Sequence, residues 1–330
     1  MNACCKVSVV IPVYGVEQFV GRCVRSLMEQ TLDSVEFIFV DDATCDGSVG
    51  EIEKVIAHYP SRSSQVRILH HEYNLGLPAA RNTGLGVASG EYVFHCDGDD
   101  YADREMLSQM YAFAKKGDYD IVWADWFLTY TDCERYMSQP SYSNPMDALK
   151  SMLSGGMKYN VWNKLVKRTV YTDNGIEFPA GYGMGEDMTM MMLFACSNRV
   201  GYLQRAYYHY VKSNVTAFSQ TYSRRHREEL KHNVQRVLDY MHNRFGDNME
   251  TELNFFCLEA KFPFLIMGDS EENYRLWTSW YPESNRYICA NTRISWRSRM
   301  LQWCAWKRQW WLVSLYYRLI IDGLYKAIYR

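Results

Sequence analysis

Four short apolar runs in the first hundred residues limit the folds open to this chain more than any other feature. They cover residues 7–13, 36–42, 66–71 and 91–96, and they are continuous and rich in β-branched residues. Runs of this kind are typical of parallel strands that are covered on both faces. Segments with helical spacing lie between them, at residues 18–29, 47–58 and 78–87. The alternation predicts an α/β fold with a mostly parallel sheet and right-handed crossovers.

Composition narrows the class of protein further. A chain of 330 residues with 48% hydrophobic residues can bury one large core or two smaller ones. The formal net charge of -2 argues against a nucleic-acid binder, because there is no excess of cations to displace counterions. The ten cysteines show no C-x-x-C pair and no zinc spacing, and no secretory leader is seen. We therefore expect thiols in a reducing cytoplasm.

In open α/β sheets, ligands bind beyond the carboxyl ends of the strands. The residues at those ends are Pro12 and Tyr14 after the first run, Asp41 and Asp42 in the second, and 97–100 after the fourth. A dinucleotide fold would place G-x-G-x-x-G after the first strand, but residues 12–18 read PVYGVEQ, with a single glycine. A Walker loop is also missing from the sequence. Phosphate must therefore be held by something other than a glycine loop.

Asp97 and Asp99 are two residues apart, and Gly98 between them lets both carboxylates face one point. Hard oxygen ligands suit Mg²⁺ or Mn²⁺, and such an ion would clamp a diphosphate. The competing interpretation is an acidic turn that caps a helix. It suits Asp103, which precedes the helical segment beginning at Arg104, whereas Asp97 and Asp99 come too early to cap that helix.

The stretches VSVVIPVYG, VDDATCDGS, NLGLPAARNTGLG and EYVFHCDGDD together resemble the amino-terminal half of a family 2 glycosyltransferase with the GT-A fold. The resemblance is continuous from about residue 6 to residue 103. It implies a Rossmann-like, mostly parallel sheet with flanking helices. It also implies metal-dependent, inverting transfer of a sugar from a UDP-sugar to an acceptor hydroxyl, with Mn²⁺ or Mg²⁺ as the cofactor. One departure is VDDATCDGS, where the family often has VDDGSTDGS.

The resemblance implies roles for the residues at the strand ends. Asp42, with Asp41 beside it, would read the uracil base, since a carboxylate accepts a hydrogen bond from the pyrimidine imide. Pro12 to Tyr14 would line the base and ribose, and Arg81 would lie near the nucleotide. The D-x-D of the family corresponds to Asp97, Gly98 and Asp99. A turn cap is the alternative for Asp42, and an exposed salt bridge is the alternative for Arg81.

Residues 160–171 and 176–195 also resemble the family, in which a W-x-K-L strand is followed by an acidic pair that opens a helix. The resemblance assigns Asp187 as the general base, which takes the proton of the acceptor hydroxyl. Glu186 would then orient the acceptor or support the loop. Both acids also suit the first turn of a helix, so capping is an alternative. The glycine-rich residues 180–185 resemble a mobile flap.

The match over residues 202–218 is loose. His209 is a candidate third metal ligand beside Asp97 and Asp99, and a structural histidine is the alternative. Lys212, Ser213 and Thr216 are candidates for the basic and hydroxyl residues that the family places near the diphosphate.

The last 35 residues explain the high aromatic content of the chain. On one helical wheel the apolar side chains share a face, opposite Lys307, Arg308, Arg318 and Lys326; the face comprises Trp303, Trp306, Trp310, Val313, Tyr317, Ile320, Leu324 and Ile328. Such a helix suits the interface of an anionic membrane. Packing on the catalytic core, or a dimer contact, is the alternative. No uncharged run reaches the roughly 20 residues that span a bilayer.

Together these observations predict three parts: a nucleotide-sugar-binding half (1–103), an acceptor-binding half (104–218) and a helical carboxy-terminal region (219–330). The acceptor would be a glycan or lipid-linked glycan at the inner face of the cell membrane, and a homo-oligomer is compatible with the sequence. Two rival functions are a non-catalytic nucleotide-sugar-binding scaffold at the membrane and a sugar-nucleotide pyrophosphorylase. The second needs a glycine-rich loop with an arginine after the first strand, which this sequence does not have.

Overall fold

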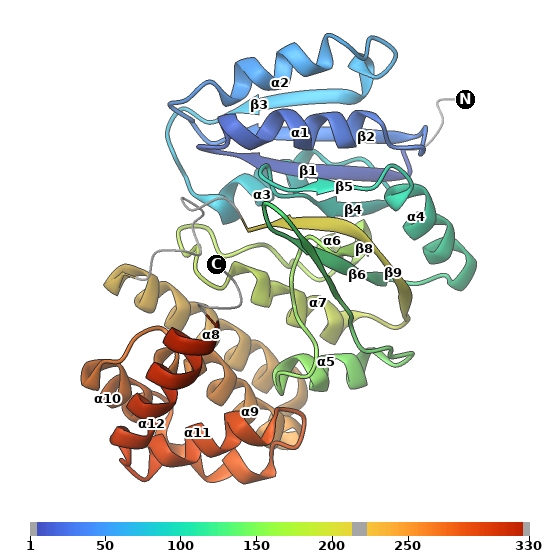
Figure 1. The fold of residues 1–330 in the computed structure, drawn as a ribbon. Coiled ribbons are helices and arrows are strands. Elements are labelled where there is room, and N and C mark those ends of the chain that lie inside the picture. The colour runs from blue at the N-terminus through green and yellow to red at the C-terminus, as the bar shows by residue number, and fades with distance from the viewer. Residues whose placement is uncertain (1–4, 213–222, 326–330) are drawn as a thin grey trace. The chain divides into compact units, whose positions relative to one another are not determined.

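The computed structural model describes residues 5–212 and 223–325. The strands in this part are β1 (Val7–Val13), β2 (Val35–Asp41), β3 (Val66–His70), β4 (Tyr92–His95), β5 (Tyr101–Ala102), β6 (Ile121–Thr129), β7 (Glu134–Met137), β8 (Lys164–Lys167) and β9 (Val200–Val211). They form one sheet in the order β3-β2-β1-β4-β8-β6-β9-β5, with β7 attached to β6 (Figure 1).

Helices join and flank these strands: α1 (Glu17–Met28), α2 (Ser48–Ile56), α3 (Leu77–Val87), α4 (Met106–Gly117), α5 (Pro145–Leu153), α6 (Arg168–Thr172) and α7 (Thr189–Cys196). The four strands and three helices expected in the first hundred residues are confirmed, and their ends agree to within two residues. The predicted α/β class with flanking helices is therefore confirmed.

Neighbouring residues of β1 pack on opposite faces of the sheet. Val9 joins a core with Val20 and Val24 of α1. Val10 instead lies against Gly84 of α3. Both strand residues are completely buried. Burial on both faces explains why this run is continuously apolar and does not alternate.

The order of the strands reverses at β1. This strand pairs in parallel with β2 on one side and with β4 on the other, and β3 lies beyond β2. In α/β sheets the carboxyl ends on either side of such a reversal form the ligand-binding crevice. The loops that follow β1 and β4 therefore occupy the position where a site is expected.

Beyond β4 the sheet becomes mixed. β8 is antiparallel to both β4 and β6, and β9 runs parallel to β6 with a register shift at Asp125. The far end of β9 returns to the loop after β4, where the hydroxyl of Tyr208 accepts a hydrogen bond from the Asp97 amide (3.0 Å). The second half of the chain thus supports the loop that carries the D-x-D.

The chain divides into two compact units. The first contains residues 1–147 and 159–237, and the second contains residues 148–158 and 238–330. The expected segments 1–103 and 104–218 therefore share the first unit, except for a short part of the second segment at 148–158. α8 (Arg224–Phe245) begins in the first unit and ends in the second.

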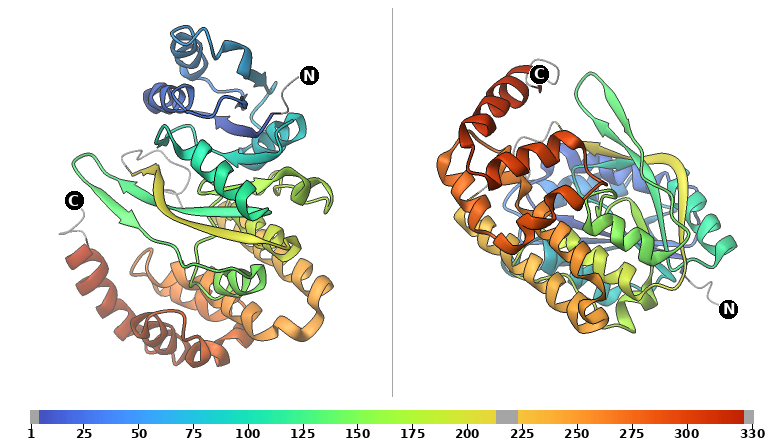
Figure 2. Two further views of the ribbon diagram at one scale, coloured as in Figure 1. Left: turned by 90° about the vertical axis from the view of Figure 1, so that its right-hand side faces the viewer. Right: turned by 90° about the horizontal axis from the view of Figure 1, so that it is seen from below.

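The described part of the second unit is helical, and it is drawn mostly from orange to red in Figure 2. Its helices after α8 are α9 (Glu250–Lys261), α10 (Glu271–Ser279), α11 (Trp296–Trp306) and α12 (Trp310–Tyr316), followed by a π-helical segment, Tyr317–Tyr325. The buried ammonium of Lys261 donates to the carbonyl oxygens of Trp280 (2.7 Å) and Tyr281 (3.2 Å) and to Asn285 Oδ1 (2.7 Å). These bonds tie α9 to the segment that follows α10.

The prediction of one continuous amphipathic helix at the carboxyl end is wrong. α11 ends at Trp306, and Arg308 has a φ of 56°, a left-handed backbone that a helix cannot contain. Val313, expected on the apolar face, is completely buried. The Leu324 side chain and Ile328 lie outside the described residues. Within residues 5–212 and 223–325, no helix has both the length and the apolar character needed to cross a membrane.

Two glycines in α3 provide a test of this packing. A Cβ on Gly84 would lie 2.4 Å from Val10 Cγ1, whereas a Cβ on Gly86 would meet nothing within 4 Å. We expect Gly84→Ala to lower the free energy of unfolding by about 1–3 kcal/mol through overpacking. Gly86→Ala should raise it by up to about 1 kcal/mol, because alanine is the better helix former. Urea unfolding measures both, and equal stability of the two variants would contradict the packing of α3 on β1.

Candidate active site

The loops after β1 and β4 lie against each other. A Cβ on Gly98 would be 3.1 Å from the Pro12 carbonyl oxygen and 3.2 Å from Val16 Cγ2, so a larger side chain would push the loops apart. Tyr14, just beyond β1, is 55% exposed and presents its ring to solvent. The structure therefore brings Pro12 and Gly98 together at the reversal of the strand order, with Tyr14 two residues farther along.

Asp42 is buried, and both of its oxygens already have partners. Oδ1 accepts from the Leu75 amide (2.8 Å) and bonds to Nδ1 of His71 (2.7 Å). Oδ2 accepts from the Gly76 amide (2.8 Å). His71 is bonded through Nε2 to Thr83 of α3 (2.9 Å). Asp42 thus fixes the loop between β3 and α3, a role that sequence reasoning missed because it depends on residues about thirty positions away.

Asp41 organises the loop on its own side. Its Oδ1 accepts from the Thr44 amide (2.9 Å), and its Oδ2 bonds to Nδ1 of His70 (2.9 Å). The two aspartates at the end of β2 therefore shape the two loops that border the expected base pocket.

Arg81 of α3 joins the two halves of the predicted site. Its Nη2 donates to Oδ1 of Asp97 at 2.8 Å and to Oε1 of Glu186 at 3.4 Å. The side chain is 1% exposed, so the alternative of an exposed salt bridge is wrong. Burial opposes its charge, but Asp97 and Glu186 outweigh burial and hold the pKa of Arg81 above its usual value.

The D-x-D loop is anchored from behind by Asp100. This carboxyl is completely buried, and it accepts from the hydroxyl of Tyr208 (2.8 Å) and from the Val211 amide (2.7 Å). Burial, reinforced by Asp99 and Asp97, raises the pKa of Asp100 well above its usual value. Asp100 is therefore a supporting residue, while Asp97 and Asp99 remain partly exposed.

Lys212 lies near the same loop. Burial lowers the pKa of its ammonium, and Asp100 and Asp99 act in the opposite direction. The ammonium lies 4.4 Å from the centre of the Tyr210 ring. The two hydroxyl candidates, Ser213 and Thr216, lie outside the described residues. Lys212 thus supplies a positive charge on the side of the D-x-D pair.

Glu186 and Asp187 open a 3₁₀ turn, η2 (Glu186–Met188), directly after Gly185, which has a φ of 90°. Removal from water and the adjacent Glu186 raise the pKa of Asp187, Arg81 and Lys164 oppose the shift, and the resulting pKa is about 8. Burial likewise raises the pKa of Glu186, and Arg81 opposes it. The pair therefore contains a carboxyl that titrates near neutral pH.

Lys164 is the lysine of the W-x-K-L stretch, and sequence reasoning gave it no role. It is buried, and its ammonium donates to the Asn160 carbonyl oxygen (2.7 Å) and to Asn163 Oδ1 (2.9 Å). Burial lowers its pKa to about 7, and Asp187 opposes the shift. The lysine is thus a second buried cation that acts on the candidate base.

The loop before the acidic pair is tied to α8. Asn233 donates to the carbonyl oxygens of Tyr182 and Met184, both at 2.9 Å. The Met184 amide donates to Oε2 of Glu229 (3.1 Å), and the Tyr182 ring stacks on His232 with a centroid distance of 3.6 Å. A flap at residues 180–185, if it opens, has to break these contacts.

Both ring nitrogens of His209 are bonded to carboxylates outside the D-x-D pair. Its Nδ1 bonds to Glu134 (2.7 Å) and its Nε2 to Asp103 (3.4 Å). Its ring is stacked between Tyr101 and Phe127. The expected N-cap role of Asp103 is wrong, because α4 begins at Met106 and its N-cap residue has no capping side-chain bond.

The residues present fit a metal ion that arrives with a diphosphate. In the described part of the chain, no cluster of three or more His, Cys, Asp or Glu side chains could hold an ion by itself. Mg²⁺ is usually bound by one or two carboxylates together with waters and substrate phosphates. Asp97 and Asp99 provide such a partial donor set. The Asp97 side chain is 24% exposed, and one of its oxygens is bonded to Arg81.

The chain is similar to known proteins in sequence and in fold. A model of the family described as glycosyl transferase family 2 matches residues 8–184. The chain is 28% identical over 269 residues to the uncharacterized glycosyltransferase EpsJ of Bacillus subtilis. The alignment covers 79% of this chain and 77% of that protein.

Two solved structures share the fold. The Staphylococcus aureus TarS fragment 1–349 in complex with UDP-GlcNAc has a TM-score of 0.71 and 21% identity, covering 96% of this chain and 95% of that one. The mannosyltransferase PcManGT of Pyrobaculum calidifontis, in complex with GDP-Man and Mn²⁺, has a TM-score of 0.52 and 15% identity, covering 98% and 87%.

The Arg81 bridge predicts a pH-dependent loss of stability. Arg81→Met leaves Asp97 and Glu186 without their cation, which should lower the free energy of unfolding at pH 7 by about 2 kcal/mol or more. The loss should shrink at pH 4, because burial raises the pKa of Glu186 and this carboxyl is then more easily protonated. Arg224→Met, which removes an exposed partner of Glu228, is the control and should change stability by less than about 0.5 kcal/mol. Equal effects of the two variants at pH 7 would rule out the bridge.

The raised pKa of Asp187 predicts a second pH effect. A pKa of about 8 in the folded chain, above the ordinary value of 3.8, means that the folded chain keeps a proton that the unfolded chain loses. This carboxyl therefore lowers the free energy of unfolding as the pH rises through that window. We expect Asp187→Asn to be more stable than the wild type, by about 1 kcal/mol or more at pH 8 and by less at pH 5. The exposed Asp132→Asn is the control, and a constant difference across pH would show that Asp187 is not shifted.

Proposed function

The chain belongs to glycosyl transferase family 2 and is a glycosyltransferase with the GT-A fold, and from this premise we propose that it transfers a sugar from a UDP-sugar to an acceptor hydroxyl with inversion and with a divalent metal ion. The observation that carries the proposal is the contact of Arg81 with both Asp97 and Glu186. It places the residues suited to a donor diphosphate beside the residues suited to an acceptor hydroxyl.

The donor is proposed to be a UDP-sugar. The TarS fragment, which shares the fold, is described in complex with UDP and with UDP-GlcNAc. In this chain the base would lie between the loops set by Asp41 and Asp42, near Pro12 and Tyr14. Because both oxygens of Asp42 have protein partners, we propose that Asp42 acts on the uracil mainly by holding the loop 71–76 in place.

The diphosphate would lie at the D-x-D loop. Asp97 and Asp99 would hold Mn²⁺ or Mg²⁺, and such an ion neutralises the charge that develops on the leaving diphosphate. PcManGT, which shares the fold, is described with Mn²⁺. Lys212 would add positive charge on the same side. His209 is left out of the proposed metal site, because both ring nitrogens are bonded to Glu134 and Asp103.

Asp187 is proposed as the general base. It would take the proton of the acceptor hydroxyl while the oxygen attacks the anomeric carbon and UDP leaves from the opposite face. One carboxylate suffices for this displacement, unlike the pair that a glycosidase uses. A pKa of about 8 suits the role, because a base works best when its pKa is close to the operating pH. Glu186 would position the loop through Arg81, and Lys164 would favour the ionised form of the base.

The acceptor is proposed to be a glycan or a lipid-linked glycan at the cytoplasmic face of the cell membrane. This part of the proposal rests on the exposed tryptophans Trp296, Trp303 and Trp311 of the second unit.

A thermal-shift panel of UDP-, GDP-, CDP- and TDP-sugars, with and without Mn²⁺, tests the donor. Ligands that bind only the folded chain raise its melting temperature by mass action. We expect the largest shift with a UDP-sugar, and we expect Asp99→Asn to remove the part that depends on Mn²⁺. A GDP-sugar that shifts the melting temperature more than every UDP-sugar would overturn the assignment.

Asp187→Asn separates binding from transfer. The variant should keep the Mn²⁺-dependent thermal shift with the UDP-sugar, since it leaves the D-x-D loop intact. Its transfer rate should fall by about 10²-fold or more, the usual contribution of a general base. Asp132→Asn serves as the control and should transfer at the wild-type rate. Unchanged transfer by Asp187→Asn would remove Asp187 as the base, and a wild type that binds donor but never transfers would favour the scaffold alternative.

A further inference from the structure

Six large apolar side chains near the carboxyl end are exposed at helical spacing. Three lie on α11 and three on α12 and the segment that follows it, and we call them together the tryptophan elbow: Trp296, Met300, Trp303, Trp311, Leu315 and Leu319. Trp296 is 62% exposed and Trp311 is 64% exposed. Large exposed apolar side chains that recur every three or four residues along each half of the elbow form an apolar surface, which is unlike the isolated apolar side chains found on most proteins.

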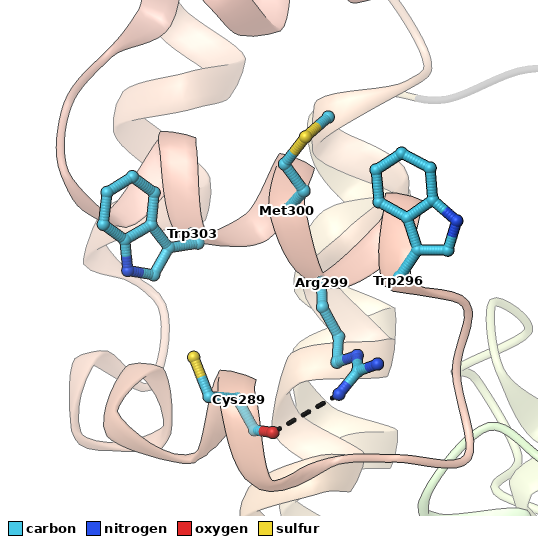
Figure 3. Close-up of a pocket in the computed structure, with 5 residues that line it drawn as sticks. All are labelled: Cys289, Trp296, Arg299, Met300 and Trp303. Atoms are coloured by element: carbon cyan, nitrogen blue, oxygen red, sulfur yellow. Dashed lines mark hydrogen bonds between the residues drawn. The ribbon is translucent and has the colours of Figure 1, made fainter.

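The first half of the elbow borders a groove. Trp296, Met300 and Trp303 line it together with Cys289 and Arg299, and its volume is about 350 Å³ (Figure 3). Arg299 donates to the Cys289 carbonyl oxygen (3.5 Å), which turns its guanidinium away from the indole rings. The opening of the groove is therefore lined mainly by apolar atoms.

Positive charge is concentrated around the elbow. Residues 284–321 hold seven of the 36 Lys and Arg residues of the chain and none of its 38 Asp and Glu residues. The chain as a whole has a formal net charge of -2, so this segment differs in sign from the rest. Among its cations, Arg297, Lys307 and Arg308 are exposed. Arg318 is neutralised by Asp269 (2.7 Å).

The break between α11 and α12 places cations between the two apolar stripes. Arg308 has a φ of 56°, and it separates Trp306, the end of α11, from Trp310, the start of α12. Lys307 and Arg308 therefore project from the turn between the stripe at 296–303 and the stripe at 311–319. Side chains of this length can reach phosphate headgroups while the indoles remain at the boundary of the acyl chains.

We propose that the tryptophan elbow is a docking surface for the interface of an anionic lipid bilayer. Tryptophan is enriched at the level of the headgroups, because its ring is apolar and its N–H is polar. Lysine and arginine beside it are attracted to anionic lipids. Each such residue increases the partitioning of the protein onto the membrane roughly fivefold. The described helices cannot span a bilayer, so the elbow lies in the interface and does not cross it.

Charge favours lipid over a second copy of the chain. An isologous dimer through the elbow would bring together two copies of the exposed cations Arg297, Lys307 and Arg308, and residues 284–321 contain no acidic residue to offset them. A bilayer with anionic headgroups supplies the missing negative charge. The binding deepens the proposed function, since it would bring the enzyme to a lipid-linked acceptor, but it can be measured without any turnover.

Sedimentation of the full chain with vesicles of phosphatidylcholine, with and without phosphatidylglycerol, tests the proposal. We expect binding to the anionic vesicles to exceed binding to the neutral ones by at least tenfold. Trp296→Ser/Met300→Ser/Trp303→Ser should weaken it by tenfold or more, and so should Lys307→Glu/Arg308→Glu. The controls are Met267→Ser, an exposed apolar residue of the same unit, and Lys116→Glu/Lys231→Glu, which makes the same change of charge elsewhere. Both should bind like the wild type.

Quenching of tryptophan fluorescence by brominated lipid locates the contact. Tryptophan emission of the wild type should fall on binding, and emission of the triple variant should fall much less. The melting temperature of the triple variant and its donor-induced thermal shift should equal those of the wild type. Equal binding to neutral and anionic vesicles, or equal binding by Lys307→Glu/Arg308→Glu and its control, would overturn the proposal. So would dimerisation in sedimentation velocity that depends on the elbow, without vesicle binding, since that would assign the surface to a second copy.

Discussion

A guanidinium buried between two carboxylates determines the arrangement of the site. Arg81 leaves water almost completely, and a buried cation is tolerated only when anionic partners surround it. The partners come from separate parts of the chain: Asp97 follows β4, and Glu186 begins η2 about ninety residues later. Because Arg81 needs both, its helix, the D-x-D loop and the acidic pair are held at fixed positions relative to one another.

The same interaction explains the chemistry expected of each carboxyl. Asp97 accepts a hydrogen bond from Arg81 at 2.8 Å and is partly exposed, which suits it to hold a cation as well. Asp187 is affected most by removal from water, which together with Glu186 raises its pKa to about 8 against Arg81 and Lys164. One environment thus combines a partly exposed carboxyl beside a cation with a carboxyl that can exchange a proton near neutral pH. A nucleophilic displacement needs both properties within one site.

The amino-terminal strands and helices could be predicted because local pattern and tertiary burial agree there. β1 is covered on both faces, so its apolar run is continuous, and α3 has Pro78 in its first turn. The D-x-D was found from its position after a strand, whereas Arg81 and the acidic pair were assigned from the resemblance to the family. The bonds of Asp42 to the loop 71–76 could not be predicted from spacing, since the partners are about thirty residues away and all three bonds involve backbone amides or an imidazole.

Errors arose where a local pattern admitted two structures. Asp103 precedes a helical segment and has the right chemistry for a cap, but its carboxyl is bonded to His209 of β9. The carboxy-terminal residues have helical spacing over more than thirty positions, yet the chain bends at Arg308. Val313 is buried and Trp311 is exposed, so the exposed apolar surface has Trp303 in common with the predicted face but otherwise consists of different residues. Neither outcome follows from spacing alone, because each depends on what packs against the segment.

Anomalous diffraction from a crystal grown with UDP and Mn²⁺ tests most directly whether the donor side of the site lies where Arg81 holds it. The manganese signal should appear at the carboxylates of Asp97 and Asp99, with the diphosphate beside it and the contacts of Arg81 to Asp97 and Glu186 retained. A manganese signal at His209, Glu134 and Asp103, or UDP bound away from the loops after β1 and β4, would contradict the proposed site.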